Sequence, residues 1–280
     1  MKILVTGGAG FVGSSLATAL YKQGHIVDIL DNYFVREYTP EGVANVIVQD
    51  INDKLDCIGY DAIYHLAAVS RIQYSFKEPR KTFKTNVDGT ENITTHASKI
   101  GAKLIYVSSS SIHNNPLQSP YSISKWIGEE VIKMYHKVYN LDAQIVRLYN
   151  VYGPGELSGT ELDAVIGKWR NDIKHNNIIE IVGDGNQKRD FTHIDDIVDG
   201  LIKLLSYEST ELKEWELGTG FNYTLNEVAH MFQEKYNCEI KYIKNQNGNY
   251  PNSLRVNDNA LKELSWSPTD KLKNYIHNDC

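Results

Sequence analysis

A tyrosine and a lysine that could move a proton stand four residues apart, in the segment Ser119-Pro120-Tyr121-Ser122-Ile123-Ser124-Lys125. This spacing puts Tyr121 and Lys125 on one face of a helix, for which Ser119 is a suitable N-cap and Pro120 a suitable first residue. A free tyrosine has a pKa of about 10, and a lysine ammonium one turn away favours its phenolate. The pair could therefore act as a general base toward a substrate hydroxyl.

Four consecutive serines, Ser108 to Ser111, follow the apolar segment Leu104–Val107. If that segment is a buried strand, its serines lie at the carboxyl end of the strand. A hydroxyl placed opposite the tyrosine could orient the substrate oxygen that loses the proton.

A glycine-rich segment, TGGAGFVG, runs from Thr6 to Gly13 between a predicted strand and a predicted helix. Glycines at such a turn let the backbone approach a pyrophosphate, which the N–H groups of the helix N-terminus can then bind. Asp31, at the end of the next strand, lies near the distance at which an acid binds the adenosine ribose. A carboxylate there repels a 2′-phosphate, so NAD is favoured over NADP, and Arg36 is the one nearby residue that leaves NADP open.

The elements that must position these groups alternate between strands and helices. The strands are predicted at Ile3–Thr6, Ile26–Asp31, Val46–Val48, Ala62–Leu66, Leu104–Ser108 and Gln144–Leu148, and the helices at Gly13–Gln23, Lys81–Lys99 and Tyr121–Tyr139. This alternation predicts an α/β fold with a doubly wound parallel sheet of the Rossmann type, in which ligands bind at the carboxyl ends of the strands.

The second half of the chain has a looser pattern, rich in Gly, Asn and aromatic residues. We expect a dinucleotide-binding domain over residues 1–151 and a smaller mixed α/β lobe over residues 152–280 that binds the substrate. Residues 190–206 are expected to return to the first domain, with a helix at Asp195–Leu205.

Composition excludes several functions. The net charge of −6 argues against a nucleic acid partner, and the absence of any run of about 18 apolar residues argues against a membrane span. The start of the chain does not resemble a signal peptide. Cys57, Cys238 and Cys280 are far apart and odd in number, which indicates free thiols in a reducing compartment, the cytoplasm. The nine histidines are scattered, so no metal site is expected.

Taken together, these motifs resemble the extended short-chain dehydrogenase/reductases, in particular the NAD-dependent epimerase/dehydratase family of nucleotide-sugar enzymes. The glycine loop is similar to the family's TGxxGxxG, and YSISK to its YxxxK. The remaining similarities are His65-Leu66-Ala67-Ala68 to HxAA, Thr85–Thr90 to NVxGT, Arg147–Pro154 to RYxNVYGP, and Gly183–Phe191 to GDGxQxRDF.

The resemblance implies a role for each matching residue. Ser109, Tyr121 and Lys125 would be catalytic. NAD would be bound by Gly7, Gly10, Phe11, Val12, Gly13, Asp31, Asn32, Asp50, Ile51, Leu66, Ala67, Ala68, Asn86, Tyr121, Lys125 and Tyr149. The substrate, a nucleotide-diphosphate sugar, would be bound by Ser70, Ser109, Ser110, Tyr121, Asn150 and Arg189, with Arg189 on the diphosphate. The family's dimer contacts imply a homodimer through the helices at Lys81–Lys99 and Tyr121–Tyr139.

The chain also departs from the family pattern. Ile112-His113-Asn114 replaces the usual Val-Tyr-Gly, and we expect His113 at the surface. Ser109 aligns with the catalytic Ser/Thr, while Ser110 remains a competitor. A second arginine for the phosphates is missing from Asn245–Tyr250, and Arg255 comes later.

The departures bear on the reaction. The family's dehydratases and decarboxylases have acids where this chain has Ser110 and Ser111, and eliminating water needs an acid and a base. The sequence therefore favours an epimerase, with C4 as the family's usual position. The alternatives are a nucleotide-sugar dehydratase or decarboxylase, an NADPH-dependent keto-sugar reductase, and a regulatory protein that binds the dinucleotide without turnover.

Overall fold

A seven-stranded parallel sheet forms the centre of the larger lobe. The computed structural model describes residues 1–278, so Cys280 lies outside the described residues. The sheet order is β11-β6-β5-β4-β1-β2-β3. Its strands are β1 (Lys2–Thr6), β2 (Ile26–Asp31), β3 (Asn45–Val48), β4 (Ala62–His65), β5 (Lys103–Ser109), β6 (Ala143–Leu148) and β11 (Lys213–Leu217). The doubly wound fold is confirmed, and the strand order reverses between β1 and β4, where such sheets bind their ligands.

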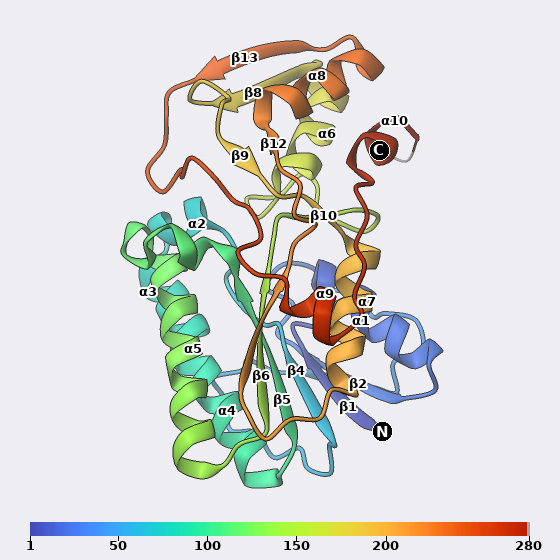
Figure 1. Ribbon diagram of the computed structural model, residues 1–280, viewed down its shortest axis with the longest axis vertical. Coiled ribbons are helices and arrows are strands. Elements are labelled where there is room, and N and C mark those ends of the chain that lie inside the picture. Colours follow the sequence, from blue (N-terminus) through green and yellow to red (C-terminus); the bar gives the residue numbers. More distant parts are fainter. Residues whose placement is uncertain (279–280) are drawn as a thin grey trace.

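Helices cover both faces of this sheet (Figure 1). On one face, α1 (Phe11–Lys22) packs against α7 (Ile194–Leu205), with α9 (Asn259–Glu263) beside them; on the other face, α4 (Gly89–Ile100) packs against α5 (Pro120–Tyr139). Two separate apolar clusters fill these two layers. Because the central strands are covered on both sides, they are continuous apolar runs rather than alternating ones.

One expected helix is not a single helix. The segment predicted at Lys81–Lys99 is divided into α3 (Pro79–Phe83), a π-helical turn η1 (Lys84–Asp88) and α4, and α2 (Ile72–Lys77) precedes them. Asn86 is fully buried in the π-helical turn, where its amide bonds the backbone N–H of Val69 at 2.8 Å and the Ser124 hydroxyl at 3.0 Å. A local widening of the helix of this kind places one side chain inward, which the apolar periodicity could not predict.

The smaller lobe lies beyond the carboxyl ends of the strands, in the upper half of Figure 1. Three two-stranded sheets and three helices build it around an apolar cluster that includes Trp169 and Phe232. Its elements are β7 (Val151–Tyr152), α6 (Val165–Asn176), β8 (Ile178–Val182), β9 (Lys188–Arg189), β10 (Thr192–His193), β12 (Tyr223–Thr224), α8 (Leu225–Tyr236), β13 (Glu239–Ile243) and α10 (Leu272–Asn278).

The chain crosses between the lobes more than once. The helix predicted at Asp195–Leu205 is α7, on the sheet, but β11 and α9 also pack with the sheet although they follow residue 152. The sequence did not predict β11. The division into units of residues 1–151 and 152–280 stays a prediction about how the chain folds.

Candidate active site

A cleft of about 1250 Å³ opens at the carboxyl ends of the parallel strands. Its walls come from the glycine loop, the ends of the strands, the start of α5 and the smaller lobe. The cleft is lined by all of the site residues that the sequence predicts, with the exceptions of Asn86 and Tyr149. The chain thus brings together side chains that are more than a hundred residues apart in sequence.

The glycine loop forms the floor of one end of the cleft. Gly7 has a φ of +70°, a conformation that favours glycine, and a Cβ on Gly13 would lie 2.2 Å from the carbonyl oxygen of Gly7. The N-cap of α1 is Gly10, with no side chain that caps the helix. The first N–H groups of α1 are therefore available to an anion, and this cradle fits the pyrophosphate of a dinucleotide.

Asp31 and Arg36 lie beside the glycine loop. The Asp31 carboxylate accepts hydrogen bonds from the N–H groups of Ala9 at 3.0 Å and Tyr33 at 2.8 Å. Burial raises the pKa of Asp31, and these two bonds oppose that effect. The Arg36 guanidinium donates to the Ala9 carbonyl at 2.7 Å and to the Ser14 hydroxyl at 3.1 Å. Arg36 thus braces the loop, and the acid at the ribose end agrees with NAD rather than NADP.

The start of α5 directs the proton-transfer pair into the cleft. The Ser119 hydroxyl caps the helix by accepting from the Ser122 N–H at 3.0 Å, and Pro120 is the first helical residue, as predicted. A hydrogen bond of 3.1 Å from the Tyr121 N–H to the Ser75 hydroxyl ties this helix end to α2. Tyr121 and Lys125, one turn apart, both line the cleft.

The surroundings of Tyr121 and Lys125 oppose their charged forms. Burial raises the pKa of Tyr121, while a hydrogen bond with Ser109 and the charge of Arg71 lower it. Burial lowers the pKa of Lys125 to about 7, and the charge of Glu129 acts in the opposite direction. The lysine can therefore change its protonation state near neutral pH, which suits a group that controls a neighbouring base.

Ser109 is the serine that contacts the tyrosine. It ends β5, its hydroxyl donates to the Ser111 hydroxyl at 3.1 Å, and it forms the hydrogen bond with Tyr121. Ser110 is buried in the following 3₁₀ turn, η2 (Ser110–Asn114), although it also lines the cleft. The geometry thus favours Ser109 as the hydroxyl that orients the substrate oxygen.

We expect Ser109→Ala to lower kcat about 100-fold, because the hydroxyl that donates a hydrogen bond to the reacting substrate oxygen is lost. The matched variant Ser110→Ala should stay within about fivefold of the unchanged protein. The measurement is kcat at saturating substrate for both variants. A larger loss for Ser110→Ala than for Ser109→Ala would reverse the assignment.

Three residues make contacts that the sequence did not reveal. Asn86 is held behind the cleft wall by Val69 and Ser124. Tyr149 is buried, and its hydroxyl donates to Glu216 at 2.6 Å. Their direct contacts with a cofactor stay predictions. His113 is exposed at the surface, as expected, and its Nε2 lies 3.0 Å from Glu216 Oε1.

Arg189, the residue expected at the diphosphate, lies on β9 in the wall of the cleft. Its guanidinium donates to the Tyr250 carbonyl at 2.8 Å and to Asn249 Oδ1 at 2.9 Å, and it stacks over the Tyr250 ring. It thus fixes the loop that precedes the late Arg255. The Arg255 side chain pairs with Asp258 at 2.9 Å.

Sequence reasoning missed several charged residues in the cleft, and two of them, Arg71 and Glu156, bear on its chemistry. Arg71 donates its Nε to the Leu162 carbonyl at 2.7 Å, and its charge acts on Tyr121. The Glu156 side chain is 2% exposed, and within residues 1–278 neither of its carboxyl oxygens has a hydrogen-bond partner, although Arg170 Nη2 lies 3.9 Å from Oε1. A glutamate after Gly-Pro-Gly is typical of an exposed turn, so no local signal predicts this burial.

Glu156 makes stability depend on pH in a predictable direction. Burial raises its pKa to about 8 from an ordinary 4.5, with Arg170 and Arg71 opposing the shift. Because the folded-state pKa is the higher one, stability is lost as pH rises between these two values. We expect Glu156→Gln to be more stable than the unchanged protein by on the order of 3 kcal/mol above pH ~8, with almost no gain below pH ~4.5. Thermal unfolding over this pH range checks it, and a gain that is the same at every pH would contradict it.

The parallel sheet, the glycine loop at the switch point, and the Ser–Tyr–Lys group at its edge define an extended short-chain dehydrogenase/reductase. The model of the NAD dependent epimerase/dehydratase family matches residues 3–218, and the chain belongs to that family. The family is NAD-dependent, and the cleft fits this cofactor, as the sequence predicted.

Individual relatives differ in their reactions. UDP-glucuronic acid decarboxylase 2 of Arabidopsis thaliana is 30% identical over 300 residues, which cover 98% of this chain and 66% of that protein. UDP-glucose 4-epimerase of Thermotoga maritima, solved with UDP-glucose, has a TM-score of 0.92 at 26% identity, covering 99% of this chain and 96% of that one. UDP-glucuronic acid 4-epimerase of Bacillus cereus, solved with its substrate and NAD, has a TM-score of 0.87 at 26% identity with the same coverage. The chain thus spans just under two thirds of the length of the plant enzyme and nearly all of the two bacterial epimerases.

Proposed function

We propose that the protein is an epimerase of a nucleotide-diphosphate sugar that uses NAD and inverts C4 through a transient keto-sugar. The observation that carries the proposal is the contact of Ser109 with Tyr121 beside Lys125, in a cleft where Ser110 and Ser111 replace the acids of a dehydratase. The likeness to two solved 4-epimerases over nearly the whole chain supports it.

The chain's own groups perform the proton transfer. Tyr121 accepts the proton of the sugar hydroxyl while Ser109 holds the same oxygen, and Lys125 favours the phenolate. Bound NAD supplies the site that takes the hydride and gives it back. Tyr121 then returns its proton to the oxygen of the inverted sugar. Net charge and redox state of the protein are unchanged at the end of a cycle.

For the keto-sugar to rotate, the cleft must bind the nucleotide tightly and leave free volume around the sugar. The cleft volume of about 1250 Å³ leaves such room. Asn150 and Arg189 line the part that we assign to the diphosphate, and Ser70 also lines the cleft. Arginine suits a diphosphate because its guanidinium can donate two parallel hydrogen bonds.

One observation favours a second candidate, a dehydratase or decarboxylase. Glu156 is a cleft residue whose carboxyl group has no hydrogen-bond partner in the described part of the chain, and burial raises its pKa to about 8. A carboxyl group with that pKa can act as acid or base near neutral pH. It could replace the carboxyl groups that dehydratases have at the positions of Ser110 and Ser111. The plant relatives, which are named decarboxylases, agree with this alternative.

The test is incubation with NAD and a panel of nucleotide-diphosphate sugars, hexoses and hexuronates, followed by NMR and mass spectrometry. An epimerase changes the coupling constants at C4 and leaves the mass unchanged. Loss of one water or of carbon dioxide identifies the second candidate, and that loss should vanish in Glu156→Gln. A protein that binds NAD but turns over no sugar would favour the regulatory class, and oxidation of added NADPH by a keto-sugar would favour the reductase.

We also propose a homodimer formed through α4 and α5, whose outer face exposes Trp126, Met134, Val138 and Tyr139. Light scattering at micromolar concentration tests it, and a monomer would refute it.

None of the helices within residues 1–278 is long and apolar enough to cross a membrane. The free thiols of Cys57 and Cys238 support the cytoplasm as the place of the reaction.

A further inference from the structure

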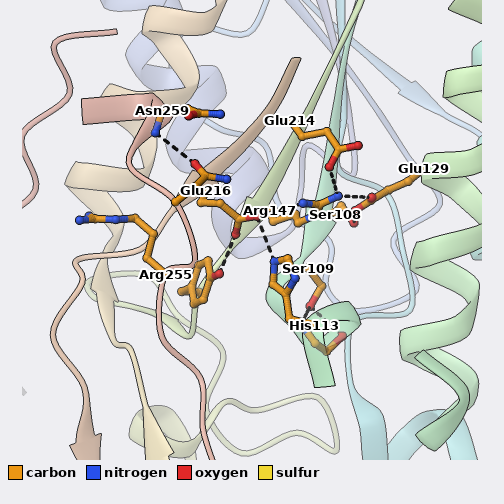
Figure 2. Close-up of polar contacts among 12 residues, drawn as sticks. Ser108, Ser109, His113, Glu129, Arg147, Glu214, Glu216, Arg255 and Asn259 are labelled. Carbon is orange, nitrogen blue, oxygen red and sulfur yellow. Dashed lines mark hydrogen bonds and ion pairs between the residues drawn. The ribbon is translucent and has the colours of Figure 1, made fainter. Parts of the chain in front are cut away.

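A buried group of charges lies next to the proton-transfer pair, and it consists of Glu129, Arg147, Glu214 and Glu216, which we call the Arg147 cluster. Arg147 donates Nε and Nη2 to the two carboxylate oxygens of Glu129 at 2.9 and 2.6 Å. It also donates Nη1 to Glu216 at 3.0 Å and Nη2 to Glu214 at 2.5 Å. Figure 2 shows Arg147 between these three acids.

The Arg147 cluster contains more negative than positive charge. Three carboxylates surround one guanidinium, and Lys133, at 2.9 Å from Glu214, adds a second cation. One negative charge remains uncompensated unless His113, which contacts Glu216, is protonated. Glu129 and Glu216 are 0% exposed, and burying charge is costly unless another group offsets it. A further positive charge nearby would therefore stabilise these buried carboxylates.

Besides Lys133, which follows Glu129 by one turn and lies 3.9 Å from its carboxylate, Lys125 is the second cation of α5 next to Glu129. It comes one turn before Glu129 on α5, and residues four apart are neighbours on a helix surface. Its Nζ lies 4.3 Å from the centre of the Tyr106 ring, and no carboxylate of the described chain comes within ion-pair distance of it. Burial lowers the pKa of Lys125 to about 7, and Glu129 is the charge that opposes this.

Other groups around Lys125 do not replace Glu129. His65 on β4 is buried, and burial together with the charge of Lys125 lowers its pKa to about 3, so it is neutral. Tyr106 on β5 lies under the amine, and burial keeps it a neutral phenol by raising its pKa. Tyr121 is the reacting group on the same helix. Arg71 at the start of α2 and Arg147 on β6 are cations. Their positive charges disfavour the charged form of Lys125.

Glu129 is itself held firmly. Besides the two bonds from Arg147, its Oε1 accepts a hydrogen bond of 2.5 Å from the Ser108 hydroxyl on β5. Ser108 directly precedes Ser109, so the same contact links the catalytic strand to the catalytic helix. The carboxylate thus accepts three hydrogen bonds from two neighbouring strands, one turn from Lys125 on the same helix.

We propose that Glu129 is a positioning residue of the reaction, which keeps Lys125 charged beside Tyr121, and that Arg147 and Ser108 hold the Glu129 carboxylate in place for this task. The inference rests on the proposed use of Tyr121 and Lys125 in proton transfer. It assigns a function to an acid that touches neither the substrate nor the cofactor.

The first test compares Glu129→Gln with Glu214→Gln, a matched control. Both remove a carboxylate that bonds Nη2 of Arg147, but only Glu129 lies on the helix of Lys125. For Glu129→Gln, we expect the alkaline limb of the kcat–pH profile to move down by about one pH unit, with kcat near pH 8 falling about tenfold. Glu214→Gln should leave the limb in place. Equal shifts in both variants would overturn the proposal.

The second test separates charge from packing. Glu129→Asp keeps the charge but shortens the side chain, so it shares any packing defect of Glu129→Gln. We expect the Asp variant to recover most of the alkaline limb. If Asp and Gln variants lose it equally, the residue is only structural and the proposal fails. This comparison also holds if Glu129→Gln is less stable, since circular dichroism at each pH shows which samples are folded.

The third test does not depend on turnover. Titration of the tyrosinate absorbance of the NAD-loaded protein, minus that of Tyr121→Phe, reports the ionisation of Tyr121. Glu129→Gln should move this titration to higher pH. Without the Glu129 carboxylate, Lys125 loses its proton at lower pH, and the neutral amine, one turn from Tyr121, no longer favours the phenolate. Glu129 itself is two turns from Tyr121, so its direct effect on Tyr121 is smaller. In a Lys125→Met background the same change should have no such effect. An upward shift that persists without Lys125 would overturn the proposal, whereas failure of every sugar to react would count against the proposed function alone.

Discussion

Tyr121→Phe is expected to lower kcat at least about 1,000-fold while the protein still folds and binds NAD. The substitution removes only the phenolic oxygen, and loss of a positioned acid–base group typically costs 10²–10⁴-fold, roughly. The measurement is epimerisation followed by NMR on the substrate that the panel identifies, with NAD binding measured separately by calorimetry.

The matched control for this variant is Tyr152→Phe. Tyr152 is also a buried tyrosine, but its hydroxyl has no hydrogen-bond partner among the residues that the structure describes, and it does not line the cleft. Removing that hydroxyl should leave kcat unchanged. If Tyr121→Phe keeps activity within tenfold, the base is another residue, and Glu156 is then the first to substitute.

Lys125→Met is expected to lower kcat by about 100- to 1,000-fold near neutral pH and to make the remaining activity rise with pH. Methionine has a similar length and no charge. Burial already raises the pKa of Tyr121, and without the ammonium the phenolate forms only at higher pH. The size follows the usual cost of losing one electrostatic partner of a reacting group. The measurement is kcat from about pH 6 to about pH 10.

Lys137→Met is the control for charge on the same helix, because Lys137 is exposed and lies three turns beyond Lys125. Its kcat–pH profile should match that of the unchanged protein. A Lys125→Met profile with the unchanged shape, merely lower, would mean that the lysine binds the cofactor without acting on Tyr121. The role that we infer for Glu129 would then fall as well.

Local sequence was sufficient for the elements that carry their own signals. Six of the seven strands of the sheet were placed within about one residue, since a strand buried on both faces is an apolar run that ends in polar residues. The start of α5 was predicted from Ser119 and Pro120, since capping depends on neighbouring residues only. The glycine loop and the Tyr121–Lys125 pair were likewise visible, because their spacing is short.

Signals that depend on distant segments could not be predicted in this way. The π-helical turn around Asn86 arises from bonds to Val69 and Ser124, and the burial of Glu156 arises from packing against α6, where a Cβ on Gly167 would lie 3.3 Å from its carboxyl carbon. Asparagine and glutamate usually lie at the surface, so the local sequence does not predict that these two residues are buried. Their environment exists only after segments that are distant in the chain have packed together.

The sequence by itself determined that this chain forms a dinucleotide-binding sheet with a Ser–Tyr–Lys group at its edge, because each of those motifs is local. Only the tertiary structure decided which charges support that group. β11 pairs with β6 in a parallel register that sets Glu216 opposite Arg147, and α5 packs over β5 so that Glu129 meets Ser108. These partners are 18 to 69 residues from Arg147 or Glu129 along the chain. Long-range pairing of this kind follows from strand order and register, which no spacing within the sequence expresses.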